Sequence, residues 1–432
     1  MTAEKAFARA RTGVLTSLIF GYAAFYLCRQ NLPAAAKALD VGLGIDKVAF
    51  GQIASAGTLA YALGKFTAGP IADRFGGKKV FLLGLFGSAI ATLALAGSST
   101  VPLFVLLWSI SRVLQSLGWA GLVHILPRWF EPKSYGTAMG ITSTSYQLGG
   151  VVTPLMMSGL IALLPGWRPL FVVPALALIA VGLVAQHFIS ENPHDRGLPD
   201  LVTQKPTQNQ LEENATSEEN LTQPWYRPIL LLLARPAFLI VLGLSFALTL
   251  VREVFNTWMP LYFTELGVGD AAAVFKSAIF PALGLAGTLA AGWYSDRYSK
   301  GRRGPVMTVL LVGLALSLVG LAHVQALALE LGLSVANLAS ILVGLAGFCL
   351  FGPYSMVGGG VVALDFGGRK AAATASGLLD GVGYFGASLA GVGVAQVVKQ
   401  NGWHGAWLLL AMLTVGSIVL CLPLWKVRAQ AD

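Results

Sequence analysis

The sequence predicts an all-α, polytopic membrane protein in which twelve transmembrane helices form two pseudo-symmetric six-helix bundles. Of its 432 residues, 55% are hydrophobic and only 11% are charged, and the mean hydropathy is +0.70. Soluble domains contain about 25% charged residues, so this composition indicates a membrane protein. Arg29 and Arg252 are 223 residues apart, and so are Asp73 and Asp296. Because two unrelated features share one spacing, we expect an internal duplication.

Each predicted helix meets the requirement of about 20 mostly apolar residues per membrane span. The helices of the first half are expected at 13–39, 48–72, 79–98, 101–127, 135–164 and 168–190. Those of the second half are expected at 228–265, 272–295, 305–325, 333–364, 371–398 and 403–425. The apolar run at 13–39 lacks a convincing cleavage site, which favours a first span over a removed signal peptide. A polar, proline-containing stretch separates the halves, so we expect bundles at 1–190 and 228–432 and a cytoplasmic linker at 191–227.

The distribution of positive charge predicts the orientation in the membrane. The net charge is +9, yet most of the 29 Lys and Arg residues fall in tails and loops on one side, which argues against a nucleic-acid partner. The exceptions are Lys37, Lys47, Arg168, Lys276 and Lys399 on the opposite side, and Arg29, Lys65, Arg112 and Arg252 inside predicted helices. By the positive-inside rule, both termini are expected in the cytoplasm.

No pattern in the sequence indicates catalysis. The three cysteines, Cys28, Cys349 and Cys421, fall in apolar segments, which indicates neither a disulfide framework nor a metal site. The sequence has no G-x-x-x-x-G-K-[ST] loop, no paired metal-ligand spacing and no Ser/His/Asp arrangement. We therefore expect a protein that is not an enzyme and needs no cofactor or metal.

Two loops carry the same motif, GPIADRFGGKK at 69–79 and GWYSDRYSKGRR at 292–303. The motif residues that we expect to act in gating are Asp73, Arg74, Asp296 and Arg297. An aspartate can cap a helix start, while the basic cluster holds the loop on the cytoplasmic side. The pattern G-x-x-x-D-R-x-x-(x)-[RK]-[RK] in both halves of a twelve-helix chain resembles the major facilitator superfamily. The fourth predicted helix, with SRVLQSLGW at 111–119, also resembles the R-x-x-Q-G-x-G signature of that superfamily, with Ser116 replacing the first glycine.

Polar side chains at helical spacing are expected to surround a central anion site. A charged side chain at the bilayer centre costs about 2.5–3.5 kcal/mol on insertion scales, and arginine does not deprotonate to avoid that cost. Residues three, four and seven positions apart share a helix face. The candidate substrate-binding residues are therefore Tyr22, Tyr26, Arg29, Tyr61, Lys65, His124, Tyr146, Arg252, Asn256 and Tyr384. Guanidinium groups, an ammonium group and phenols facing one cavity suit a phosphate group.

Other interpretations of these residues remain open. A single tyrosine or asparagine can serve helix packing, and His124 can serve packing or a backbone hydrogen bond. Arg112 is expected in a structural hydrogen-bonding role. Glu253, rotated about 100° from Arg252 on its helix, and Asp380 are candidates for proton or charge coupling. The sequence leaves open whether Lys65 and Asp380 form an ion pair.

The segment GYAAFYLCRQN at 21–31 resembles the G-Y-x-x-[YF]-Y-x-x-R-K-N pattern of the organophosphate:phosphate antiporters, which include carriers of glycerol-3-phosphate and hexose-6-phosphate. Segments 64–66, 252–262 and 383–386 resemble helices 2, 7 and 11 of that family. The resemblance implies that Arg29 and Arg252 bind the phosphate group. Three departures leave the organic part of the substrate open. Gln30 stands where the family usually has lysine, Tyr146 stands near a histidine of the glycerol-3-phosphate carriers, and Asp380 is outside the pattern.

The resemblance implies a secondary active transporter that exchanges an organophosphate for inorganic phosphate by alternating access, as a monomer in a bacterial inner membrane. Its expected partners are a small anionic substrate and the lipid bilayer. Two alternatives remain. One is a proton-coupled symporter of an organic anion with Glu253 and Asp380 as titrating groups. The other is a membrane sensor of hexose phosphate, because some relatives of these antiporters signal to a kinase.

Overall fold

The computed structural model describes residues 3–98, 100–130, 132–199, 227–297, 303–358 and 361–426, and these are almost entirely helical. The elements of the first half are α1 (Ala3–Phe25), the 3₁₀ turn η1 (Tyr26–Cys28), α2 (Asn31–Leu43), α3 (Lys47–Phe75), α4 (Gly77–Ala96), α5 (Val101–Trp129), α6 (Pro132–Leu163), α7 (Pro169–Phe188) and η2 (Pro193–Arg196). Those of the second half are α9 (Arg227–Leu233), α10 (Pro236–Glu265), α11 (Asp270–Ser277), α12 (Ile279–Arg297), α13 (Arg303–Ala322), α14 (Val324–Leu331), α15 (Val335–Gly358), α16 (Val361–Cys421) and η3 (Leu422–Lys426).

Within the described residues, ten helices are long and apolar enough to cross a membrane. One of these segments, Gly377–Trp425, covers two predicted spans, because the chain reverses direction at Gly402, where φ is 64°. Glycine adopts this left-handed conformation without steric cost. The separate helices expected at 371–398 and 403–425 are therefore two arms of one bent element, α16. The all-α polytopic fold is confirmed, and its helices are consistent with twelve spans, since α3 lies where the second span was predicted.

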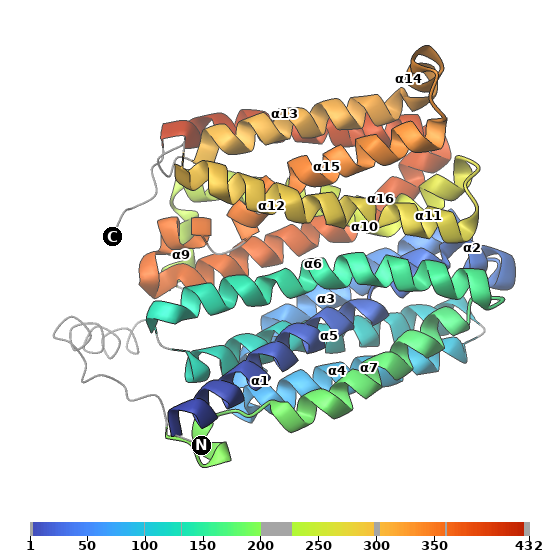
Figure 1. Ribbon diagram of the computed structural model, residues 1–432. Coiled ribbons are helices and arrows are strands. Elements are labelled where there is room, and N and C mark those ends of the chain that lie inside the picture. Colours follow the sequence, from blue (N-terminus) through green and yellow to red (C-terminus); the bar gives the residue numbers. More distant parts are fainter. Residues whose placement is uncertain are drawn as a thin grey trace.

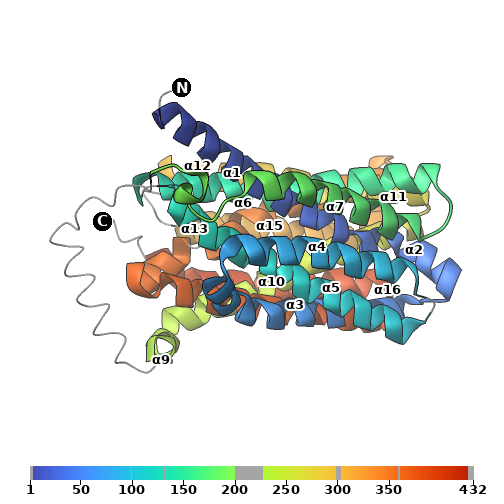
Figure 2. The ribbon, with the colours of Figure 1, turned by 90° about the horizontal axis from the view of Figure 1, so that it is seen from below.

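The helices of residues 3–188 lie together, and those of residues 236–421 form a second group beside them (Figure 1). Within the first group, α4 packs between α5 and α7 (Figure 2), and within the second, α15 packs against α12 and α13. Below, these are called the first and second helix groups. The linker prediction falls mostly on residues 200–226, which lie outside the described residues, so the exact domain limits stay a prediction.

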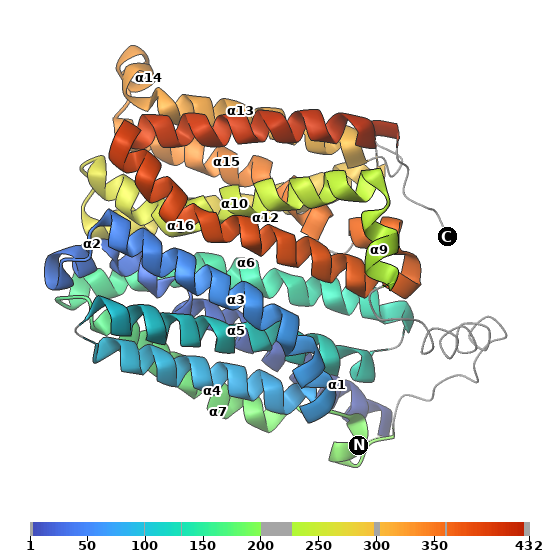
Figure 3. The same ribbon diagram turned by 180° about the vertical axis from the view of Figure 1, so that it is seen from behind.

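The two helix groups meet along α3 and the first arm of α16 (Figure 3). A Cβ atom added to Gly391 would lie only 2.2 Å from the carbonyl oxygen of Gly51, so the two backbones are in direct contact there. Ser55 Oγ donates to the carbonyl of Ser388 at 2.5 Å and accepts from the N–H of Val392 at 2.9 Å. Small residues thus allow a close helix crossing that polar contacts hold in register.

Further contacts between the groups lie at the end of the molecule opposite the N-terminus, called here the Glu265 end (Figure 1). Lys47 Nζ lies 2.8 Å from Glu265 Oε1, and Trp403 Nε1 donates to Glu265 Oε2 at 2.8 Å. Ser158 Oγ donates to the carbonyl of Ala271 at 2.7 Å. Two further polar contacts, Lys65 with Asp380 and Gln147 with Thr288, join the groups farther from this end.

The outer surface carries large apolar side chains along the helices. Leu83, Ile90 and Val309 are 55%, 62% and 72% exposed. Exposure of this kind over many helices suits lipid as the surrounding medium, because single exposed apolar residues are normal in soluble proteins but continuous apolar surfaces are not.

Candidate functional site

The first span is broken where the candidate site begins. Pro33 lacks an N–H group, and its ring would clash with the carbonyl of Arg29 four residues earlier in a regular helix. The chain instead passes from α1 through the turn η1 into α2, and the N–H groups of Arg29 and Gln30 both donate to the carbonyl of Tyr26 at 3.0 Å. This break lets two consecutive side chains, Arg29 and Gln30, line the same cavity.

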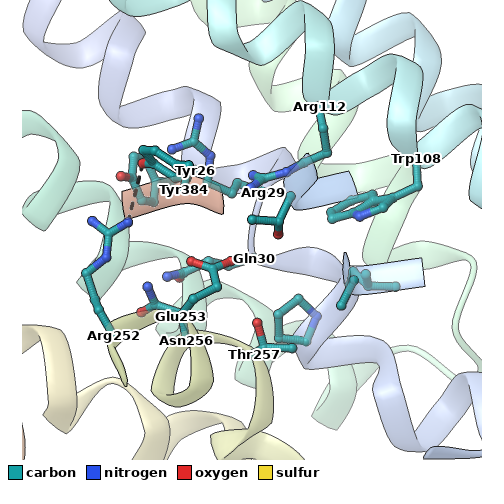
Figure 4. A pocket seen from close by; sticks show the side chains of 14 residues that line it. Tyr26, Arg29, Gln30, Trp108, Arg112, Arg252, Glu253, Asn256, Thr257 and Tyr384 are labelled. Atoms are coloured by element: carbon teal, nitrogen blue, oxygen red, sulfur yellow. Dashed lines mark hydrogen bonds between the residues drawn. The ribbon is translucent and has the colours of Figure 1, made fainter. Parts of the chain in front are cut away.

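A cavity of about 550 Å³ lies between the two helix groups, and Figure 4 shows the side chains that line it. Its polar and aromatic lining residues are Tyr26, Arg29, Gln30, Thr58, Trp108, Arg112, Arg252, Glu253, Asn256, Thr257 and Tyr384. A second cavity of about 330 Å³ shares Gln30 and Asn256 with it and extends toward the Glu265 end. The mixed polar and aromatic lining is typical of a small-molecule site.

Arg29 lies against two tyrosine rings. Its Cζ atom is 4.7 Å from the ring centre of Tyr26 and 4.6 Å from that of Tyr61. Its Nε atom donates to Gln115 Oε1 at 3.2 Å, whereas its buried Nη2 atom has no hydrogen-bond partner among the described residues. Cation–π contacts hold the guanidinium group in place without using its donors.

Arg252, on α10, is held in the same way from the second helix group. Its Cζ atom lies 4.4 Å from the ring centre of Tyr354, and its Nη2 atom donates to Tyr384 Oη at 3.3 Å. Its buried Nε atom has no partner among the described residues. Tyr354 was not identified from the sequence, because it stands alone in an apolar helix without a polar residue at helical spacing.

Arg112 also lines this cavity, although the sequence favoured a structural role for it. Its side chain is buried, and its Cζ atom lies 4.8 Å from the ring centre of Tyr61. Its Nη1 atom donates to Gln115 Oε1 at 3.3 Å, while its Nε atom has no partner in the described part of the chain. Gln115 therefore holds Arg29 and Arg112 together through one amide oxygen.

The three arginines share one chemical property. Each keeps one buried N–H-bearing nitrogen, Arg29 Nη2, Arg112 Nε and Arg252 Nε, that no described residue satisfies. A buried donor without an acceptor costs about 1–3 kcal/mol. An anion with several oxygen acceptors in this cavity would remove that cost.

The ion pair that the sequence left open is present. Lys65 Nζ on α3 lies 2.6 Å from Asp380 Oδ2 on α16, so the pair joins the two helix groups. Lys65 Nζ is also 4.9 Å from the ring centre of Tyr384. Lys65 is not among the residues that line the cavity, so its charge acts on the cavity from behind Tyr384.

Three tyrosines expected to bind substrate also stand behind the lining residues. The buried ring of Tyr61 packs on that of Tyr384, with centres 4.9 Å apart. Tyr22 packs on Trp119 with ring centres 5.2 Å apart, and Tyr146 packs against the apolar core. They support the wall of the cavity, whereas Tyr26, Arg29, Arg252, Asn256 and Tyr384 line it as expected.

His124 does not line the cavity but lies on α5 beside the start of α4, where the N–H of Gly77 is 3.1 Å from its Nδ1 atom. Its Nδ1 atom is 2.7 Å from Glu191 Oε1, which also accepts from the N–H of Gly77, while Glu191 Oε2 accepts from the N–H of Lys78 at 2.7 Å. Burial alone would raise the pKa of Glu191, but these hydrogen bonds outweigh burial and lower it. The hydrogen-bonding alternative weighed for His124 is the arrangement found.

The loop motifs can be followed only in part. The side chains of Asp73 and Asp296 lie outside the described side chains. Arg74 and Arg297 are exposed at the ends of α3 and α12. The gating role expected for these four residues stays a prediction.

Comparison with known proteins gives a consistent family assignment. The family described as Major Facilitator Superfamily matches residues 18–391. A "Probable hexose phosphate transport protein" of Chlamydia trachomatis is 30% identical over 98% of this chain and 92% of its own length. The "Membrane sensor protein UhpC" of Salmonella typhimurium is 28% identical over 98% of this chain and 93% of its own length. The "Hexose-6-phosphate:phosphate antiporter" of Escherichia coli is 27% identical over 93% of this chain and 88% of its own length.

Solved structures agree on the fold. The crystal structure of a D-xylose-proton symporter superposes with a TM-score of 0.75, covering 96% of this chain and 98% of the symporter, at 14% sequence identity. Identity this low shows a common fold and carries no statement about substrate.

Proposed function

Because this chain belongs to the major facilitator superfamily, we propose that it is a secondary active transporter that exchanges an organophosphate for inorganic phosphate. Its family and structural relatives are transporters, not enzymes. The observation that carries the proposal is that three arginines, drawn from both helix groups, line one cavity and each keep a buried donor that no described residue satisfies. The relatives named for hexose phosphate support the same class of substrate.

In this proposal Arg29, Arg112 and Arg252 bind the phosphate group. A guanidinium group presents planar donors that match phosphate oxygens, and the resulting bonds are charge-assisted. The tyrosine rings that pack on the arginines fix their orientation before substrate arrives. Tyr26, Asn256 and Tyr384 offer further polar groups to the same ligand.

The charges of the site match those of a phosphate monoester. Three arginines and Glu253 give the cavity a net charge of two positive units, and the Lys65–Asp380 pair is neutral as a whole. A phosphate monoester carries about −1.5 to −2 at pH 7. Bound substrate would therefore nearly neutralise the cavity, whereas an empty cavity would have to bury about two uncompensated charges on closing. Only the loaded carrier would then reorient readily, which makes transport an exchange.

Alternating access would follow from the contacts between the helix groups. The Glu265 end is joined by the Lys47–Glu265 ion pair and by the close crossing of α3 and α16. We assign this end to the outside and both termini to the cytoplasm, following the positive-inside rule. Rocking of the groups would open the Glu265 end in one half of the cycle and the opposite end in the other.

The experiment that tests the proposal is uptake of radiolabelled phosphate by proteoliposomes. Uptake should be fast when the vesicles contain unlabelled phosphate and slow when they contain none, and it should not follow an imposed pH gradient. Competition by glucose 6-phosphate and glycerol-3-phosphate should slow it. Uptake that needs no internal phosphate would refute exchange.

Proton-coupled transport of an organic anion is a second candidate, because Glu253 lines the cavity and forms no ion pair with a described residue. Asp380, by contrast, forms an ion pair with Lys65 Nζ at 2.6 Å. Uptake driven by a pH gradient and lost in Glu253→Gln would favour this candidate.

A sensor is a third candidate, favoured by the likeness to a protein named as a membrane sensor. A sensor would bind phosphate esters in detergent solution but would show no exchange in proteoliposomes.

A further inference from the structure

The cavity has two chemically different walls. The arginines supply donors only, since a guanidinium group has no acceptor. Glu253 and the amide oxygen of Gln30 supply acceptors, and Figure 4 shows both among the side chains around the same space. A ligand that satisfies both walls must accept hydrogen bonds at one end and donate them at the other.

The acceptor wall is unsatisfied within the described part of the protein. Gln30 Oε1 is buried and has no hydrogen-bond partner there. Glu253 forms no ion pair with a described Lys, Arg or His, although it stands next to Arg252 in the sequence. It is therefore not neutralised by direct contact with an arginine, and its carboxylate remains available to a ligand.

Sugar and polyol hydroxyls are donors that fit this wall. A hydroxyl group can donate to a carboxylate or an amide oxygen, and a hydrogen bond to a charged acceptor is stronger than one between neutral groups. A second anionic group on the ligand would instead meet the negative charge of Glu253, which disfavours it by like-charge repulsion. Thr257 and Asn256 on the same helix can add donors or acceptors but carry no charge.

We propose that Glu253 and Gln30 select phosphate monoesters whose organic part carries hydroxyl groups, and that Glu253 excludes esters with a second anionic group. This inference rests on the proposed function, because it assumes that the arginines hold the phosphate end. Inorganic phosphate has no organic part, so its binding makes no hydroxyl contact of this kind with the acceptor wall.

Two compounds with the same carbon skeleton test the selection. Glycerol-3-phosphate carries a hydroxymethyl group where 3-phosphoglycerate carries a carboxylate. Their inhibition constants are measured against exchange of radiolabelled phosphate in proteoliposomes. Wild-type protein should prefer glycerol-3-phosphate by about tenfold or more, and Glu253→Gln should reduce that preference by about tenfold. Because the preference is the ratio of the two inhibition constants, a change in phosphate affinity that affects both compounds equally cancels.

Two variants complete the experiment. Gln30→Met should weaken inhibition by glycerol-3-phosphate without improving that by 3-phosphoglycerate, because it removes an acceptor and no charge. Glu330→Gln, an exposed glutamate on α14, is the matched control and should leave the ratio unchanged. Phosphate exchange in each variant shows that it is folded.

The outcomes separate the two proposals. A wild type that exchanges phosphate but does not distinguish the two compounds, or an unchanged ratio in Glu253→Gln, overturns the inference alone. A wild type that exchanges no phosphate overturns the proposed function and the inference with it.

Discussion

Replacing Asp380 by asparagine should strengthen phosphate binding. The substitution removes the carboxylate that lies 2.6 Å from Lys65 Nζ and keeps the shape of the side chain. The ammonium group is then no longer paired, so its positive charge acts on an anion in the cavity. Because Lys65 stands behind Tyr61 and Tyr384 and not in the lining, this effect is electrostatic and needs no new contact.

The size of the effect follows from the geometry. Lys65 Nζ is 5.7 Å and Arg29 Cζ is 4.6 Å from the ring centre of Tyr61. A phosphate on Arg29 is thus on the order of 10 Å from Lys65, which gives about 1.7 kcal/mol per pair of unit charges at an effective dielectric constant of about 20. The side chains of Lys65 and Asp380 are 19% and 31% exposed, so solvent screens the attraction. We expect a net gain of about 1 kcal/mol, or roughly fivefold tighter binding.

Calorimetric titration of the purified protein with inorganic phosphate measures this gain. Lys65→Met should weaken binding, because it leaves Asp380 as an uncompensated anion. The double variant should bind nearly as tightly as the wild type, because the two opposite effects sum to about zero. Unchanged or weaker binding in Asp380→Asn would refute the claim that the Asp380 carboxylate competes with phosphate for the positive charge of Lys65.

Two further predictions concern residues outside the arginine pair recognised in the sequence. Arg112→Gln should weaken phosphate binding by about 2 kcal/mol, or about thirtyfold, because it removes a charge-assisted donor from the cavity. Calorimetric titration with phosphate measures the loss. An affinity equal to that of the wild type would show that Arg112 has a structural role only. Glu191→Gln should lower thermal stability by about 1 kcal/mol at neutral pH, because the neutral amide accepts more weakly from Gly77 and Lys78 at the start of α4. Since the pKa of Glu191 is lowered in the folded protein, its contribution is present above the ordinary pKa of glutamate and is lost as the pH falls through the lowered value. Wild type and variant should therefore converge in melting temperature at low pH, and a constant difference would contradict this role.

The sequence predicted the arginine pair because burying a cation in a membrane is costly and the cost is visible in the residue types alone. It could not predict that Arg112 joins them. Its position within a superfamily signature suggested a structural role, and only the tertiary packing on Tyr61 and Gln115 brings its guanidinium group to the cavity.

Helical spacing alone did not predict that Glu253 lines the same cavity as Arg252. It placed this residue about 100° from Arg252, yet the cavity is wide enough to be lined by both. The contact between Gly51 and Gly391 was also beyond the sequence, since 51 glycines give no sign of which ones meet another backbone.

The central claim is that Arg29 and Arg252 bind the phosphate group of the substrate. The most direct test is phosphate exchange in proteoliposomes by Arg29→Lys and Arg252→Lys beside the wild type, with Arg9→Lys, an exposed arginine on α1, as the control. Lysine keeps the charge but loses the planar donor fork, so each site variant should lose about thirtyfold or more in exchange while the control keeps the wild-type rate. Exchange at the wild-type rate in either site variant would contradict the claim.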